Sequence, residues 1–431
     1  MHRQLITLLA LALAPSAGHA QTIAVRAGRL IDGTGAVPVR NAVIVIQDGR
    51  ITAAGAGVAV PAGARVIDLS GMTVLPGFVD AHVHLTGRVL GEPGWDNAAV
   101  RDLPADAALR GARHARLTLE AGFTTVRNVG AGGFADVSLR DAINRGDVPG
   151  PRMLVAAHSL GTTGGHCDGT NGYVPEIFGE EPGPERGVAD GPDEIRAGVR
   201  YQVKHGADVI KICATGGVLS EGDSVGAQQY MDDELRAVVE TAHLVERRVA
   251  AHAHGTAGIK AAIRAGVNSI EHGSILDDEA IRLFVEHGTY LVPTLMAGEA
   301  VEAMAKSGAL RGERADKALA IAPRMRESIR KAVTGGVKIA LGTDAGVMPH
   351  GTNGHEFTLM VQWGGMTPMQ AIVAGTGAAA DLLGLQGQVG RVASGYSADL
   401  VAVPGDPLAD IAVLEKVDWV MKGGEVVKGG R

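Results

Sequence analysis

Residues 74–85 read Val74-Leu-Pro-Gly-Phe-Val-Asp-Ala-His-Val-His-Leu85, a mostly apolar run that ends in two histidines. Side chains at positions i and i+2 of a β-strand point to the same face, so His82 and His84 are expected to lie side by side. Two imidazoles at this spacing can bind one metal ion, although a single His-x-His pair also occurs in strands that bind nothing. The stretch therefore predicts a buried strand with a candidate metal site at its carboxyl end.

Seven further runs rich in β-branched residues follow along the chain, at residues 122–128, 152–159, 207–214, 248–254, 267–273, 289–295 and 337–344. Helical patterns lie between them, at residues 193–204, 232–247, 256–265, 277–287 and 323–334, the last with Pro323 at its first position. Apolar strands that alternate with helices indicate a parallel sheet covered on both faces, and eight such units match the α/β fold known as the (β/α)8 TIM barrel. The alternative is an open doubly wound sheet, but no Gly-x-Gly-x-x-Gly turn follows a strand.

The two ends of the chain have a different pattern, with short alternating strands and turn signals such as Asp32-Gly33 and Asp48-Gly49. Each end is too short to close a good core alone. We therefore expect residues 21–73 and 386–431 to build one small composite β-sandwich, and residues 74–385 to form the barrel.

Composition and the first residues narrow the class of protein. Hydrophobic residues make up 46% of the chain, which excludes a disordered protein. The net charge of −7 and the absence of a long basic run argue against a nucleic-acid partner.

Residues 1–20 combine a short basic start, an apolar stretch and small residues at Gly18 and Ala20, the pattern of a signal peptide. We expect an exported, periplasmic or secreted protein that has no membrane association after the signal peptide is cleaved.

Chemically active residues recur at the carboxyl ends of the expected strands, where barrel enzymes place their active sites. The pattern includes Ala251-His-Ala-His254, Ile270-Glu-His272, Leu341-Gly-Thr-Asp344 and Val209-Ile-Lys211-Ile-Cys213. A lysine flanked by apolar residues could point outward, but beside four histidines and an aspartate Lys211 is expected to take part in the site.

These motifs resemble the amidohydrolase superfamily, and the resemblance covers nearly all of the chain beyond residue 20. Residues 76–84, Gly164-Gly-His166, Val209-Ile-Lys211, the 251–255 stretch and Ser269-Ile-Glu-His272-Gly are similar to the prolidase-like metal-dependent carboxypeptidases grouped with imidazolonepropionase-related proteins. Bacterial amidohydrolases that degrade ochratoxin A belong to the same group.

The resemblance implies two zinc ions per subunit. His82 and His84 with Asp344 would hold the first ion, His252 and His272 the second, and Lys211 would bridge both as a carboxylated lysine. Imidazole nitrogens and carboxylate-like oxygens suit Zn²⁺. Asp344 would also act as general base and then general acid. His166 and His254 are expected to be catalytic and to contact the substrate, and Tyr230 to bind it.

The expected reaction is attack of metal-bound hydroxide on the amide bond to a C-terminal amino acid, in N-acyl amino acids or dipeptides. Ochratoxin A is one of the expected substrates, and its hydrolysis would release L-Phe. The alternatives are hydrolysis of cyclic amides or lactones, as by an imidazolonepropionase, and an Xaa-Pro or Xaa-Arg dipeptidase without ochratoxin activity. A non-enzymatic zinc-binding protein is less well supported, because the proton-transferring Asp344 is present. The resemblance also implies a homo-oligomer, with an octamer as one expected size.

Cys167 and Cys213 are the only cysteines in the chain. Export would permit a disulfide, but sequence alone gives no distance between them, so their pairing stays open.

Overall fold

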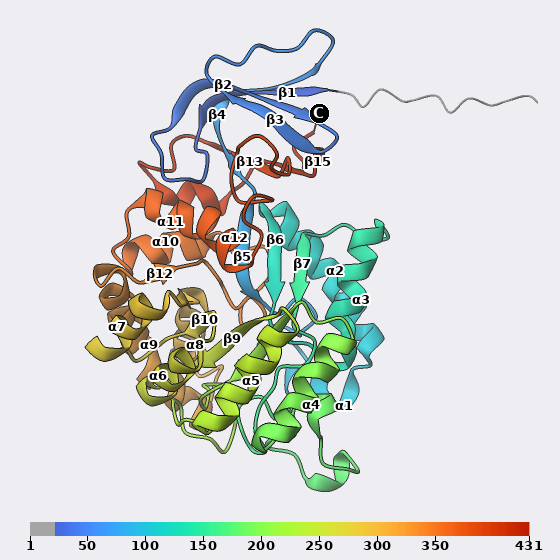
Figure 1. Ribbon diagram of the computed structural model, residues 1–431, viewed down its shortest axis with the longest axis vertical. Coiled ribbons are helices and arrows are strands. Elements are labelled where there is room, and N and C mark those ends of the chain that lie inside the picture. The colour runs from blue at the N-terminus through green and yellow to red at the C-terminus, as the bar shows by residue number, and fades with distance from the viewer. Residues whose placement is uncertain (1–21, 431) are drawn as a thin grey trace, which may run out of the picture.

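The computed structural model describes residues 22–430, and Figure 1 shows a β-sheet unit at one end of the molecule and a larger α/β unit below it. The expected signal peptide lies outside the described residues.

Seven strands from both ends of the chain form one mixed sheet, in the order β15-β14-β13-β4-β1-β2-β3. Their bounds are β1 (Ile23–Leu30), β2 (Val39–Gln47), β3 (Arg50–Gly55), β4 (Arg65–Pro76), β13 (Leu400–Pro404), β14 (Trp419–Lys422) and β15 (Glu425–Lys428). Strand β4 joins the two ends of the chain, since it pairs parallel with β1 and antiparallel with β13. Both termini therefore build this unit together, as expected, and their strands form a single mixed sheet in which β4 ends at Pro76.

The sheet curls around its own small core. Ile51 of β3 and Met421 of β14 belong to the same buried cluster, although the two strands stand far apart in the order of the sheet. The turn between β2 and β3 is Asp48-Gly49, with φ of 49° and 73°, which is the positive-φ geometry of a two-residue hairpin. A Cβ at Gly49 would lie 2.6 Å from the carbonyl oxygen of Gly423, so only glycine allows the two hairpin turns to meet.

The α/β unit contains eight parallel strands, one inside each run that the sequence indicates. They are β5 (Phe78–Val83), β6 (Phe123–Asn128), β7 (Arg152–Val155), β8 (Val209–Cys213), β9 (Arg248–Ala253), β10 (Ser269–His272), β11 (Tyr290–Val292) and β12 (Lys338–Ile339). They form a three-stranded sheet, β5-β6-β7, and a five-stranded sheet, β12-β11-β10-β9-β8. Parallel bridges Leu160–Ile212 and Val83–Ala345 connect the two sheets. Leu160 follows β7 and Ala345 follows β12, whereas Ile212 and Val83 lie within β8 and β5.

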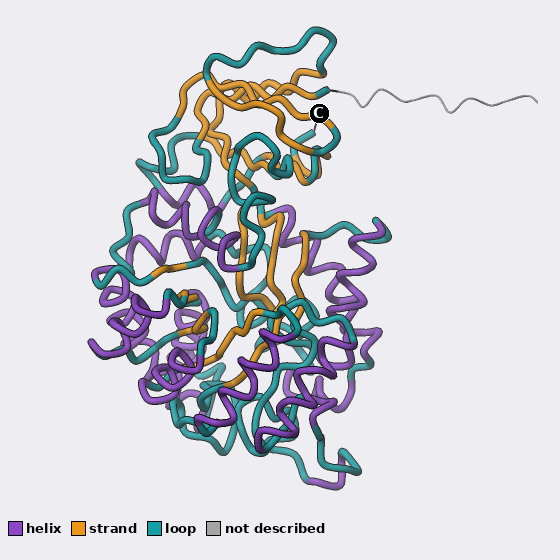
Figure 2. The backbone as a smooth tube through the Cα atoms, in the orientation of Figure 1, coloured by secondary structure: helices purple, strands orange, loops and turns teal. Residues whose placement is uncertain are grey.

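Helices surround these strands, as the purple coils around the central orange strands in Figure 2 show. The helices are α1 (Ala98–Arg101), α2 (Pro104–Glu120), α3 (Ala135–Arg145), α4 (Gly191–Lys204), α5 (Asp232–Leu244), α6 (Thr256–Ala265), α7 (Asp278–His287), α8 (Leu295–Ser307), α9 (Gly312–Thr334), α10 (His355–Gln362), α11 (Pro368–Ala374) and α12 (Gly377–Leu382). Among the described residues, no helix is both long and apolar enough to cross a membrane.

One helix start expected from the sequence is wrong. Pro323 does not begin a helix but lies inside α9, where proline removes a backbone hydrogen bond at a cost of about 3 kcal/mol. Tertiary packing overrides this cost, because Ala318, Ile321 and Met325 on both sides of the proline lie in one buried cluster with Val301 of α8.

Candidate metal centre

Six of the expected site residues form two clusters in the described part of the chain. His82, His84 and Asp344 place one ligand atom each within 4.8 Å of one another, and so do His252, His254 and His272. The clusters are neighbours, since the ring centroids of His82 and His272 lie 5.1 Å apart. All six residues line one cavity of about 460 Å³.

The first cluster follows from the strand geometry of β5. Oδ1 of Asp344 lies 3.4 Å from Nε2 of His82 and also 3.4 Å from Nε2 of His84, so one carboxylate faces both imidazoles. His82 is buried, whereas His84 is one-third exposed and forms the open side of the site. Asp344 has a φ of 60°, a conformation that costs a non-glycine residue energy and is often found at functional sites.

The second cluster combines the ends of β9 and β10. Nδ1 of His254 hydrogen-bonds Oγ of Ser274 at 2.6 Å, and Nδ1 of His272 hydrogen-bonds Oγ1 of Thr294 at 2.7 Å. Such bonds to the far ring nitrogen orient the other nitrogen, Nε2, toward a ligand. The sequence assigns His254 to the substrate. In the structure its ligand atom lies within 4.8 Å of those of His252 and His272, and its role as a substrate contact stays a prediction.

The donor set fits a metal ion. Nε2 of His252 is buried without a hydrogen-bond partner among the described residues, and an unpaired buried nitrogen is costly unless a ligand satisfies it. Burial lowers the pKa of His84 to about 4 and that of His254 to about 3, which favours the neutral imidazoles that bind metals. Nitrogen donors together with a carboxylate are the ligands that Zn²⁺ prefers.

Lys211 lies on β8 and lines the same cavity with only 4% of its surface exposed. Within the residues that the structure describes, it forms no ion pair. Burial lowers the pKa of Lys211 to about 8, although the charges of Glu271 and Asp344 oppose the shift. A buried lysine without a partner is rare, so Lys211 remains a candidate member of the site.

A buried ion pair beneath the first cluster is the main feature that sequence reasoning missed. Nδ1 of His82 donates to Glu271 at 2.8 Å, and Nη2 of Arg127 donates to the other oxygen of Glu271 at 2.8 Å. Burial would raise the pKa of Glu271, but the charge of Arg127 and the bond from His82 lower it to about 2. The carboxylate thus fixes the proton of His82 on Nδ1 and leaves Nε2 free for a metal.

Removing one partner of this pair should destabilise the fold strongly. We expect Arg127→Met to lower the free energy of unfolding by about 3–5 kcal/mol, because Glu271 would keep a buried charge without its cation. The matched control is Arg116→Met, which breaks the exposed pair Arg116–Glu120 and should cost less than about 1 kcal/mol. Denaturant unfolding measures both variants, and equal small losses would contradict the role of the buried pair.

His166 and Tyr230 are the remaining candidates for substrate contact, and only His166 lines the cavity. His166 lines the cavity, and its ring stacks on that of His252 with centroids 4.2 Å apart. Tyr230 is only 1% exposed, is packed in the main core and does not line the cavity. Its hydroxyl has no hydrogen-bond partner among the described residues, so substrate binding by Tyr230 stays a prediction.

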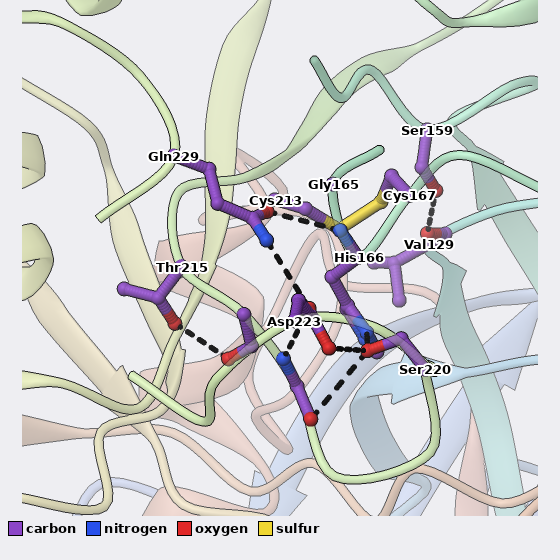
Figure 3. Close-up of a disulfide and its surroundings, with 12 residues drawn as sticks. Val129, Ser159, Gly165, His166, Cys167, Cys213, Thr215, Ser220, Asp223 and Gln229 are labelled. Carbon is purple, nitrogen blue, oxygen red and sulfur yellow. Dashed lines mark hydrogen bonds between the residues drawn. A yellow bond between two sulfur atoms is a disulfide. The ribbon is translucent and has the colours of Figure 1, made fainter. Parts of the chain in front are cut away.

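Cys167 and Cys213 form a disulfide with their Cα atoms 5.7 Å apart, which resolves the pairing that the sequence left open (Figure 3). The bond connects the residue after His166 to the end of β8 and lines the cavity.

We expect the double variant Cys167→Ala/Cys213→Ala to lose about 2–4 kcal/mol of unfolding free energy. A reductant should lower the stability of the wild-type protein by a similar amount and leave the variant unchanged. If the reductant affects both proteins equally, its effect does not come from this bond.

Comparison with known proteins assigns the family. Residues 73–427 match the model of the amidohydrolase family. The chain is 36% identical to ochratoxinase of Aspergillus niger over 437 aligned positions, which cover 96% of this chain and 88% of that protein. A solved Xaa-Pro dipeptidase with bound methionine in its active site is 44% identical and superposes with a TM-score of 0.91, covering 95% of this chain and all of that one. The crystal structure of A. niger ochratoxinase gives a TM-score of 0.84 at 34% identity, with 96% of each chain covered. The chain therefore belongs to the amidohydrolase family and is a hydrolase.

Proposed function

We propose that this protein is a zinc-dependent amidohydrolase that cleaves the amide bond to a C-terminal amino acid in N-acyl amino acids or dipeptides, including ochratoxin A. The observation that carries the proposal is the pair of adjacent ligand clusters, His82/His84/Asp344 and His252/His254/His272, in one cavity with a buried lysine. Its similarity to ochratoxinase and to an Xaa-Pro dipeptidase supports this substrate class.

In this proposal, each cluster would hold one zinc ion. Carbon dioxide would add to the neutral amine of Lys211 with loss of a proton, and the resulting carbamate would serve as a ligand to both ions. Carboxylation would turn a buried cation without an ion pair into an anion, which removes the cost of its burial. The bound ions would supply Lewis acidity toward the amide carbonyl and lower the pKa of an attacking water. The eight strands would form a closed (β/α)8 barrel whose carboxyl end carries all of these residues.

Asp344 is the proton carrier in this reaction. Asp344 faces the imidazoles of His82 and His84. Burial alone would raise the pKa of Asp344, but its interactions with these two histidines are stronger and lower the pKa. As a carboxylate it can accept a proton from the attacking water and pass it to the leaving nitrogen. One water is consumed, the C–N bond breaks, and the products are a carboxylic acid and an amine.

The cavity wall favours apolar substrates. Leu90, Trp95, Ile321 and Met325 line it beside the metal ligands. Among the described residues that line this cavity, Trp95 is the one that can stack on an aromatic side chain with a Phe, Tyr or Trp ring. We therefore expect amides of apolar amino acids such as Phe, Leu and Met to be hydrolysed faster than amides of Asp or Lys.

A second candidate is hydrolysis of cyclic amides. An imidazolonepropionase of Nocardia farcinica is 28% identical to this chain, over 84% of it. A screen that contains N-acyl-Phe, ochratoxin A, Xaa-Pro, Xaa-Arg and cyclic amides would distinguish the two. Release of free amino acid from the linear amides supports the proposal, whereas activity on cyclic substrates alone would replace it.

We also propose that the protein is exported and assembles as a homo-oligomer, which mass spectrometry of the secreted form and light scattering would test.

A further inference from the structure

His166 is held in the cavity by contacts on two sides (Figure 3). Its backbone N–H donates to Oε1 of Gln229 at 3.0 Å, and its ring nitrogen Nδ1 lies 2.8 Å from Oγ of Ser220. The disulfide anchors the next residue, Cys167, to β8. The position of the ring beside the metal ligands is therefore fixed by residues that do not themselves line the metal clusters.

A single carboxylate holds both of these partners. Oδ1 of Asp223 accepts from Oγ of Ser220 at 2.7 Å, and Oδ2 accepts from Nε2 of Gln229 at 3.1 Å. Nζ of Lys317 lies 3.0 Å from Oδ1 and forms an ion pair with Asp223 that is almost completely buried. The hydrogen bonds of Asp223 thus reach His166 by two routes. One runs through Ser220 to the imidazole ring, and the other runs through Gln229 to the backbone N–H.

The direction of each hydrogen bond follows from the charge of Asp223. Paired with Lys317, it is a carboxylate and can only accept, so Ser220 must give it the hydroxyl proton. The oxygen of Ser220 then accepts from His166, so Nδ1 carries a proton, and in the neutral form of the ring this is the only ring N–H. The other ring nitrogen, Nε2, carries a lone pair, and among the described residues nothing donates to it.

We propose that Asp223 is a positioning residue that, through Ser220 and Gln229, presents Nε2 of His166 as a hydrogen-bond acceptor for the N–H of the scissile amide. The inference rests on the proposed function for the identity of the substrate. It also predicts that the enzyme distinguishes a secondary amide from an ester of the same shape, which has no N–H.

The test compares N-benzoyl-L-phenylalanine with the matching benzoate ester of L-phenyllactic acid. In Ser220→Ala the ring of His166 can move its proton to Nε2 and would then repel the amide N–H. We expect kcat/KM for the amide to fall about tenfold, on the scale of one hydrogen bond, while the ester changes less than about threefold. Asp223→Asn should act in the same direction, because its amide can donate to Ser220 and reverse the chain of bonds.

Two further variants separate positioning from general damage. Ser220→Thr keeps the hydroxyl and should restore the amide-to-ester ratio of the wild-type protein. Ser307→Ala removes an exposed hydroxyl at the end of α8 and should leave both rates unchanged. If the amide and the ester lose rate in parallel in Ser220→Ala, or if neither loses rate, the proposal is wrong.

A second measurement does not depend on turnover. In ¹⁵N-histidine NMR spectra of the full-length protein, the two neutral tautomers of a histidine give distinct ring-nitrogen signals. We expect the proton of His166 on Nδ1 in the wild-type protein and on Nε2 in Asp223→Asn, with His166→Ala identifying the signal. A wild-type proton on Nε2 would overturn the inference. Failure of the wild-type protein to hydrolyse either compound would instead count against the proposed function, and the spectra would still decide the role of Asp223.

Discussion

Asp344→Asn is expected to retain bound zinc but to turn over amides about 10²–10⁴-fold more slowly than the wild-type protein. The asparagine keeps the shape of the side chain and an oxygen that can face His82 and His84, which lie 3.4 Å from Oδ1 of Asp344. It cannot take a proton from water or return one to the leaving nitrogen. The loss should therefore appear in kcat more than in metal content.

Steady-state kinetics and elemental analysis of the same sample measure the two quantities together. Asp381→Asn is a suitable control, because Asp381 forms an ion pair with Arg391 in which both side chains are one-third exposed, and it does not line the cavity. It should retain the wild-type rate. An Asp344→Asn protein with full zinc content and full turnover would show that another group moves the proton.

Lys211→Ala is expected to lose at least one of two zinc ions and to lower kcat/KM by more than about 100-fold, since even outer-shell changes at metal sites cost about 10–100-fold. Lys211 is buried and lines the cavity, so its removal leaves space where a bridging anion would lie. Short carboxylic acids such as acetate or propionate should enter this space and restore part of both the metal content and the rate.

The control for this rescue is sodium chloride at equal ionic strength, which should restore nothing. Titration of the variant with acetate, followed by metal analysis and kinetics, measures the effect. A variant that binds two metals and remains active without any added acid would rule out a bridge at Lys211.

The proximity of the candidate site residues could be predicted from the sequence because they lie at the carboxyl ends of parallel strands. The division into two ligand sets came from the family resemblance, which placed His254 at the substrate and not among the metal ligands. His82 and His84 share a face by their spacing of two, and the other ligands lie at the carboxyl ends of neighbouring parallel strands. The same reasoning placed all eight strands of the α/β unit within the expected runs.

Contacts between distant parts of the chain could not be predicted in this way. Arg127 and Glu271 are 144 residues apart, and nothing in either segment specifies the other. A clue was present, since each puts a charge inside an apolar strand, where an unpaired charge is rarely tolerated. The role of Ser220 and Asp223 depends on the path of a loop, and the continuation of α9 through Pro323 depends on packing against α8.

We propose that two metal ions per chain take part in releasing a C-terminal amino acid from an amide. The most direct test is a titration of chelator-treated protein with Zn²⁺, in which free L-Phe from N-benzoyl-L-phenylalanine is measured at each step. The account predicts no release without metal and a rate that rises until two equivalents of zinc per chain are bound. Undiminished release from the metal-free protein, or a rate that is already complete at one equivalent, would contradict it.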